Sequence, residues 1–119
     1  MEKSAALAAL AALAQETRLD IYRLLVQAGP EGLPAGQVGE RLGLASPTLA
    51  FHLKELKNAG LVSCTRNGRS LIYAAAYPVM NALLFYLTEN CCGGAAAAQG
   101  VGCVPETSLV CGAEEKETG

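Results

Sequence analysis

Two adjacent cysteines, Cys91 and Cys92, are the residues with the clearest chemical potential in this chain of 119 residues. Two thiolates presented side by side suit a soft, thiophilic ion. Cys103 and Cys111 follow eleven and nineteen residues after Cys92, and Cys64 is the fifth cysteine. An odd number of cysteines without an export signal favours metal or redox chemistry in a reducing compartment over a disulfide framework.

The charge distribution indicates a second chemistry, contact with nucleic acid. The whole chain carries a net charge of −2, but residues 41–72 hold five basic side chains and one acidic side chain. Beyond Asn90 there is one basic residue against four acidic ones. An acidic end therefore masks a basic middle segment of the kind that contacts phosphate.

The helix that should carry this contact is predicted to begin at Ser46 and to close at about Gly60. Ser46 is expected as its N-cap, with Pro47 as its first residue. A shorter helix lies between residues 34 and 42, and Gly43 turns the chain between the two helices. In the helix that begins at Ser46, the leucines of the buried face are Leu49, Leu53 and Leu56.

A β-hairpin is predicted directly after this helix, because the hydrophobic period changes there to strict alternation. Asn67-Gly68 is a type I′ turn signal. We expect Cys64 to lie opposite Leu71 and Val62 opposite Tyr73, which makes one face of the hairpin apolar and Cys64 a small core residue. The predicted strands are residues 61–66 and 69–75, and the polar face holds Ser63, Thr65 and Ser70.

The first and last helices are predicted to form a dimer. The last helix, residues 78–92, is apolar on nearly all sides, so one side must meet a second subunit. The first helix carries a leucine stripe at Leu7, Leu10 and Leu13 among alanines, whose small side chains allow another helix to approach closely.

The chain is predicted to hold one domain and a tail. Residues 1–92 are expected to form a DNA-binding and dimerisation domain, and residues 93–119 a flexible tail that contains cysteines. No apolar run reaches the roughly 18 residues of a membrane span, and the N-terminal residues lack the features of a signal peptide. We therefore expect a cytoplasmic protein.

The order of these elements is that of a winged helix-turn-helix, a mainly α fold with a β-hairpin. The helix N-terminus offers N–H groups and a positive dipole end to phosphate, and arginines beside the turn can reach the backbone or minor groove. The residues expected on the DNA side are Ser46, Thr48, Phe51 and Lys54 of the helix and Arg66 and Arg69 of the wing. A solvated basic face, or a module that contacts protein, is the alternative.

Three segments carry a family resemblance: residues 44–62 (LASPTLAFHLKELKNAGLV), Thr17-Arg18-Leu19 upstream, and Arg66-Asn-Gly-Arg69 downstream. They resemble the ArsR/SmtB family of bacterial metalloregulatory repressors, over roughly residues 7–92. The resemblance implies a homodimer, paired through the first and last helices, that binds operator DNA until a metal or metalloid releases it. It also gives His52, the only histidine, a packing or phosphate-contact role rather than metal ligation.

The resemblance extends to the cysteines. Residues 88–92, Thr-Glu-Asn-Cys-Cys, are similar to the helix end of an arsenite-responsive subgroup, which implies Cys91 and Cys92 as ligands with a third cysteine in the tail. Adjacent cysteines favour trivalent arsenic or antimony, with three thiolates, over zinc, which takes four ligands and usually has more widely spaced cysteines. Cys103 closes a shorter loop than Cys111 and is the favoured third ligand, with Cys111 as the alternative. Methylarsenite needs the pair alone.

These observations predict a metalloid-responsive transcriptional repressor, with As(III) as its inducer and no catalytic cofactor. The sequence shows no phosphate-binding glycine loop, serine elbow or paired carboxylates, so we do not expect an enzyme. The expected partners are double-stranded operator DNA and a second copy of the chain, and not a membrane. The alternative is a thiol redox or persulfide sensor on the same fold, in which Cys91 or Cys92 pairs with Cys103 or Cys111.

Overall fold

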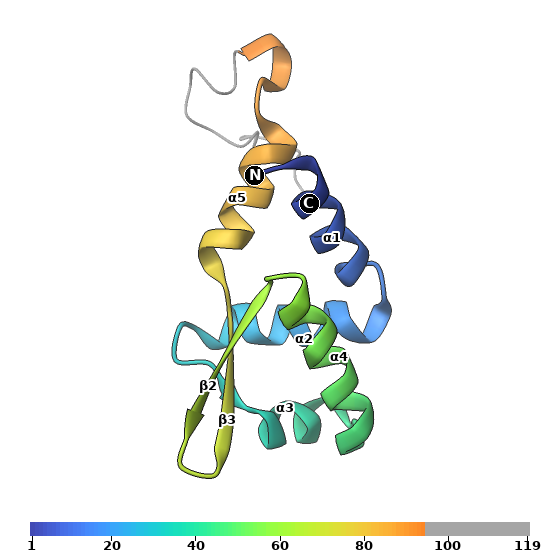
Figure 1. Cartoon of the computed structure of the whole chain (residues 1–119), viewed down its shortest axis with the longest axis vertical. Coiled ribbons are helices and arrows are strands. Elements are labelled where there is room, and N and C mark those ends of the chain that lie inside the picture. The colour runs from blue at the N-terminus through green and yellow to red at the C-terminus, as the bar shows by residue number, and fades with distance from the viewer. Residues whose placement is uncertain (95–119) are drawn as a thin grey trace. The chain divides into compact units, whose positions relative to one another are not determined.

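The computed structural model describes residues 1–94, and the chain divides into two compact units, Met1–Leu83 and a second one that begins at Leu84. The elements run α1, α2, β1, α3, α4, β2, β3 and α5 (Figure 1), followed by the short 3-10 helix η1. The helices are α1 (Lys3–Leu13), α2 (Glu16–Ala28), α3 (Ala35–Leu42), α4 (Ser46–Asn58), α5 (Tyr77–Thr88) and η1 (Cys91–Gly94). The strands are β1 (Leu33–Pro34), β2 (Val62–Asn67) and β3 (Ser70–Ala75). This is the winged helix-turn-helix predicted from the sequence.

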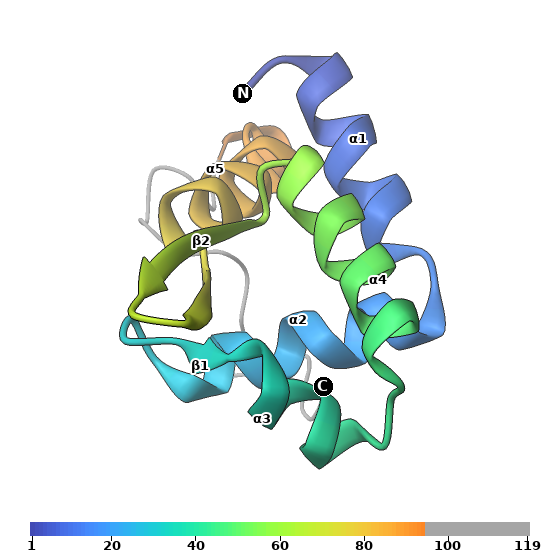
Figure 2. The same ribbon diagram turned by 60° about the horizontal axis from the view of Figure 1, so that its bottom comes forward.

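The turn between α3 and α4 depends on two glycines. Gly43 ends α3 with φ +67°, a left-handed conformation that glycine adopts without steric cost. A Cβ on Gly39 would lie 3.1 Å from Leu49 Cδ2 and 3.2 Å from the Leu44 carbonyl oxygen, so glycine there lets α4 pack closely on α3. Figure 2 shows the two helices meeting at this turn.

The three strands form an antiparallel sheet in the order β1-β3-β2. Asn67 pairs with Ser70, so Gly68 and Arg69 are the central residues of the turn, and Gly68 has φ +65°. A glycine with positive φ at the first central position is typical of a type II′ turn, whereas the predicted turn centred on Asn67-Gly68 is wrong by one residue.

The shifted turn changes which residues of the hairpin pair. Cys64 lies opposite Tyr73, and Val62 opposite Ala75, rather than the partners predicted from the sequence. Moving the turn by one residue slides the pairs but keeps odd and even positions on their own faces. Ser63, Thr65 and Ser70 therefore still share one face, as predicted.

The core of the first unit is made by the helices and the hairpin together, with Ile21, Leu25, Val38, Leu53, Leu56 and Leu61 almost fully buried. In α1 the buried residues are the alanines, Ala6, Ala9 and Ala12. Leu7 and Leu10 of the predicted leucine stripe are exposed. The small residues bring α1 close to α2 and α4, and the leucines are left outside.

Helix α5 ends at Thr88, four residues before the predicted end, so Cys91 and Cys92 follow the helix instead of closing it. The Thr88 hydroxyl donates to the Leu84 carbonyl at 2.8 Å. Asn90 and Cys92 then take positive φ values of 60° and 57°, which break the helix. Of the helices within residues 1–94, none is long and apolar enough to cross a membrane.

Candidate functional site

The N-terminus of α4 is open to solvent. Ala45, in an extended conformation, is the residue before the helix, and Ser46 is its first residue, so the prediction of Ser46 as N-cap is wrong. Pro47 is the second residue of the helix, one position later than predicted and still within the first turn. Because alanine has no side-chain acceptor, residue 45 leaves the first-turn N–H groups uncapped, and they can meet an anion.

The side chains of α4 divide into a buried and an exposed face. Leu49, Leu53 and Leu56 are buried, as predicted. The four helix residues predicted to face DNA are exposed: Ser46, Thr48, Phe51 and Lys54. The exposed fraction is 55% for Phe51 and 9% for His52. The structure thus places His52 inside the domain, which agrees with the packing role expected for it and sets it apart from the exposed residues expected at the DNA.

His52 lies against Arg18, which the sequence marked only as part of the Thr17-Arg18-Leu19 segment, with no role predicted for it. The distance from Arg18 Nη1 to His52 Nδ1 is 3.4 Å. The two residues are 34 positions apart, so no local pattern pairs them. The burial of His52 had a signal, because it lies three residues after Leu49 and four before Leu56, on the face that both leucines bury.

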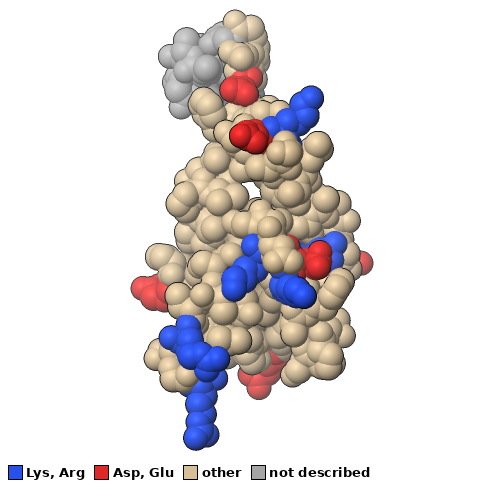
Figure 3. All heavy atoms as spheres, in the orientation of Figure 1, with Lys and Arg blue, Asp and Glu red and all other residues tan. Residues whose placement is uncertain are grey.

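The wing presents its two arginines at the tip of the hairpin. Arg66 and Arg69 are both exposed, and Arg69 is a central residue of the turn. Figure 3 shows basic side chains gathered over this tip, at the lower left of the view. Arg66 lies on the same strand face as Cys64, two residues away.

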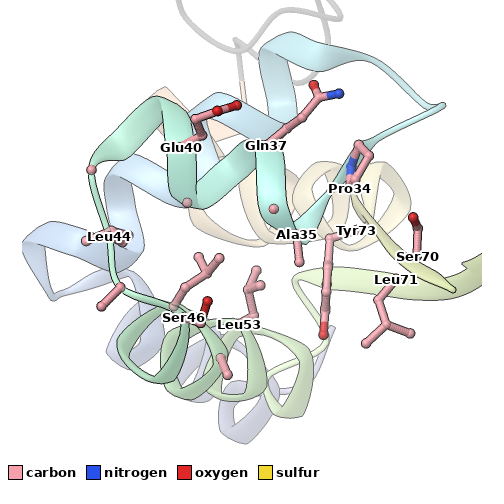
Figure 4. A pocket seen from close by; sticks show the side chains of 16 residues that line it. Pro34, Ala35, Gln37, Glu40, Leu44, Ser46, Leu53, Ser70, Leu71 and Tyr73 are labelled. Atoms are coloured by element: carbon pink, nitrogen blue, oxygen red, sulfur yellow. The ribbon is translucent and has the colours of Figure 1, made fainter.

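An open groove of about 980 Å³ separates the wing from the helix-turn-helix. Leu53 of α4 and Tyr73 of β3 line it from two sides, with the start of α3 between them (Figure 4). Burial raises the pKa of Tyr73, and the Cys64 thiol opposite it raises the pKa further. The exposed face of α4 and the wing tip are therefore two surfaces with a groove between them.

The thiol pair lies in the second unit. Cys91 is half-buried and Cys92 exposed, and their Sγ atoms are 3.3 Å apart, a hydrogen-bond contact. Within residues 1–94 no three His, Cys, Asp or Glu side chains come together as a metal site. Cys103 and Cys111 lie outside the described residues. The described chain thus brings together two of the three predicted ligands.

Sequence comparisons identify the central segment. A helix-turn-helix domain model matches residues 13–65. The uncharacterized HTH-type transcriptional regulator YceK of Bacillus subtilis (strain 168) is 39% identical over 59 residues, which are 50% of this chain. The match covers 58% of YceK, so less than two thirds of that relative is represented.

Structure comparisons agree over longer stretches. An ArsR-like transcriptional regulator from Rhodococcus sp. RHA1 has a TM-score of 0.66 and 25% identity, over 89% of this chain and 94% of that one. HlyU from Vibrio cholerae N16961 has a TM-score of 0.59 and 33% identity, over 73% and 97%. The homodimeric winged helix-turn-helix DNA-binding domain of Mb0332 from Mycobacterium bovis, a possible ArsR-family transcriptional regulator, has a TM-score of 0.60 and 27% identity, over 71% and 76%.

The winged fold, with α4 exposed on one face, is that of a transcriptional regulator of the helix-turn-helix class. The chain belongs to the ArsR family of such regulators. This membership confirms the prediction that the chain is not an enzyme.

Proposed function

We propose that the chain is a homodimeric repressor that binds operator DNA and is released when trivalent arsenic binds Cys91, Cys92 and a third thiolate, Cys103. The observation that carries the proposal is the 3.3 Å separation of the first two sulfur atoms. In this proposal residues 1–92 bind DNA and dimerise, and residues 93–119 supply the third thiolate.

The proposed DNA interface is the exposed face of α4 together with the wing tip. The uncapped first turn of α4 meets a backbone phosphate, while Thr48 and Phe51 face the base edges of the major groove. Lys54, Arg66 and Arg69 neutralise phosphates or enter the minor groove. Ser46 adds a hydroxyl donor beside the first turn. His52 acts from within the domain and makes no direct DNA contact.

The proposed dimer rests on two exposed apolar surfaces. In α1 the exposed residues are Leu7 and Leu10. In α5 the exposed large apolar residues are Leu84, Phe85 and Leu87. Large apolar side chains gathered on helix faces are typical of an interface between subunits. Mb0332 is described as homodimeric, which supports a second copy as the occupant.

The sulfur geometry favours arsenic over zinc. Two sulfur atoms 3.3 Å apart, each about 2.3 Å from one ion, subtend nearly a right angle at the ion. A right angle is narrower than the tetrahedral angle that zinc prefers, and it suits a pyramidal trivalent ion with an outward lone pair. Antimonite prefers the same pyramidal geometry with three thiolates, whereas methylarsenite needs only Cys91 and Cys92.

Release requires two arrangements of the dimer. The recognition helices of the two subunits must match half-sites about one helical turn, roughly 34–36 Å, apart. Binding of the ion after α5 favours a different arrangement of the two subunits, in which the recognition helices no longer match the half-sites. The ligand must prefer that arrangement by at least about 1–3 kcal/mol, the usual coupling free energy.

A second candidate function uses the same thiols without a metalloid. In it Cys91 or Cys92 forms a disulfide with Cys103 or Cys111, the two thiols giving two electrons and two protons to an oxidant, or one thiol takes a sulfur atom from a persulfide donor, which leaves as a thiol. The chain would then be a redox or persulfide sensor that still represses transcription from the same DNA interface.

One titration tests both candidates. The full chain first selects its site from a library of DNA duplexes with a randomised centre, and the labelled duplex then reports binding by fluorescence anisotropy. Arsenite, methylarsenite, antimonite and zinc are added in turn with reducing agent present, and the persulfide donor is added to reduced protein after that agent has been removed. Release by arsenite and not by zinc supports the main proposal, and release by the persulfide donor alone supports the second. Selection of no duplex would contradict both.

A further inference from the structure

Arg18 connects three helices through one side chain. Its Nε donates to the Ala12 carbonyl oxygen at 2.7 Å, and its Nη1 lies 3.4 Å from His52 Nδ1. The Arg18 backbone N–H donates to the Gln15 side-chain oxygen at 2.8 Å, which caps α2. The cap fixes the backbone of Arg18 at the start of α2, while the guanidinium joins the end of α1 to the middle of α4.

The direction of each bond follows from the chemistry of the guanidinium. Arginine has donors and no acceptor, so the Ala12 oxygen and His52 Nδ1 must both accept, and the ring proton of His52 is on Nε2. The Ala12 carbonyl belongs to the last turn of α1, whose carbonyls lack helical partners and attract cations. The contact therefore depends on where α1 ends in space.

The contacts continue from His52 to the proposed DNA face. The ring of His52 meets the ring of Phe51 edge to face, with centroids 5.4 Å apart and an interplanar angle of 64°. His52 is buried and Phe51 is more than half exposed. A path of direct contacts thus runs from Ala12 through Arg18 and His52 to Phe51, and all of it lies within the unit Met1–Leu83.

A hollow lies beside this path, where α1 meets α4. The hollow has a volume of about 270 Å³ and is lined by Arg18, Glu55 and small residues such as Ala8 and Ala12. The buried alanines of α1 pack closely beside this hollow, and the two Arg18 side-chain contacts add a polar connection from α1 to α4. The space also allows the guanidinium to follow a displacement of α1.

We propose that Arg18 and His52 are positioning residues that set α4, and with it Phe51, relative to the end of α1. A displacement of α1, such as a change of subunit arrangement would cause, then reaches the DNA face through this pair. The inference rests on the proposed function, in which α4 binds DNA and α1 contributes to the dimer.

The test compares two amide substitutions at residue 52. In His52→Asn the side-chain oxygen can occupy the place of Nδ1 and accept from Arg18, whereas His52→Gln carries its amide to the place of Nε2. Both variants bury the same polar group, so a difference between them reports the Arg18 contact and not the loss of the ring. Arg18→Gln removes the link from the other side, and Arg23→Gln removes an exposed arginine from the same helix as the matched control.

The readouts are affinity for the selected duplex, the salt dependence of that affinity, and thermal unfolding of each full-length variant. We expect His52→Gln and Arg18→Gln each to weaken binding about tenfold, and the double variant by no more than either alone. His52→Asn should retain most of the affinity, and Arg23→Gln all of it. The slope of affinity against salt should stay unchanged, because no phosphate contact is lost.

Other outcomes would overturn the inference. The pair does not act as a unit if the double variant loses affinity by the product of the two single losses. The same holds if His52→Asn and His52→Gln lose affinity equally. A shallower salt slope in Arg18→Gln would make Arg18 a direct phosphate contact. Selection of no duplex by the unaltered chain would overturn the proposed function as well, so the two failures are distinguishable.

Discussion

The Sγ atoms of Cys91 and Cys92 lie 3.3 Å apart because the backbone between α5 and residue 94 leaves the helical path. Asn90 and Cys92 have positive φ, which costs about 1–3 kcal/mol for a residue other than glycine. Asparagine tolerates this conformation better than most residues, whereas Cys92 has no such advantage. The local strain is thus associated with a close approach of two thiols, a geometry useful to a chelating ligand.

We predict that Cys91→Ser and Cys92→Ser each abolish release by arsenite and change DNA affinity in the absence of arsenite by less than about twofold. The reason is that neither cysteine lies on α4 or on the wing. Anisotropy with the selected duplex measures both effects. Cys64→Ser is the matched control and should still respond to arsenite. Weaker DNA binding by the serine variants without arsenite would instead make the pair structural.

We predict that Cys103→Ser weakens the response to arsenite strongly and the response to methylarsenite little, because methylarsenite needs two thiolates. Cys111→Ser should leave both responses unchanged. The same titration gives the concentration for half-release with each compound. If a chain truncated after Val104 no longer responds to arsenite, the third ligand is Cys111.

We predict that Arg69→Ala weakens binding to all duplexes by a similar factor and lowers the salt slope by about one, as loss of a single phosphate contact does. Arg69 is exposed at the centre of the turn, so the substitution removes no internal contact that the structure shows. Binding at several salt concentrations measures the slope. Arg23→Ala, on α2, should leave it unchanged. A base-dependent loss at Arg69 would indicate direct readout.

We predict that Gly32→Ala destabilises the fold by about 2 kcal/mol or more. Gly32 has φ +73°, and a Cβ there would press on the Tyr73 carbonyl, across from the short strand β1. Urea unfolding measures the loss. Gly36→Ala in α3 is the control, because a Cβ at residue 36 meets no described atom within 4 Å. Alanine in a helix should stabilise it by up to about 1 kcal/mol. Equal effects would contradict the close approach of β3 to Gly32.

We predict that Tyr22→Phe stabilises the fold by about 1 kcal/mol near neutral pH, since a buried polar group without a partner is costly. Among the described residues the Tyr22 hydroxyl has no hydrogen-bond partner. Thermal unfolding measures the change, with Tyr86→Phe, a half-buried tyrosine of α5, as control. A clear loss of stability would show that the hydroxyl has a partner.

The same variant tests a pH dependence. Burial, and then the neighbouring Tyr77, raise the pKa of Tyr22 above its ordinary value. The unfolded chain therefore loses this proton first as pH rises past about 10, which favours unfolding. Below that pH Tyr22 adds no pH dependence, and above it the free energy of unfolding falls as pH rises until the raised pKa is passed. Tyr22→Phe should lose less stability than the unaltered chain in this alkaline range, and an equal loss would contradict the assignment.

The sequence predicts the elements better than the surfaces they bury. The three-residue spacing in α1 is real, but it does not say whether Leu7 or Ala6 faces inward, because that depends on how closely another helix packs. Asn67-Gly68 fits the centre of a type I′ turn and Gly68-Arg69 fits the centre of a type II′ turn. The sequence pattern alone does not decide between these two turns. The strand β1 has two residues and no period at all, so it is recognisable only beside its partner β3.

The candidate site follows the same rule. Exposure of Phe51 and burial of Leu53 are fixed by helix geometry and are visible in the sequence. The contact of Arg18 with His52 joins residues from different helices and needs the tertiary fold. For the same reason the separation of the two adjacent sulfur atoms required the backbone conformation at Asn90 and Cys92.

The short strand β1 has a consequence for protein engineering. It pairs through Leu33 with Tyr73 and through Pro34 with Ile72, so β3 is the central strand of the sheet and the wing is joined to the segment that leads into α3. A chimera that takes its wing from a relative must therefore exchange two pieces of chain, residues 32–34 along with residues 62–75. Transplanting the hairpin alone would pair a foreign strand with a resident edge, and the wing would not behave as a separate module.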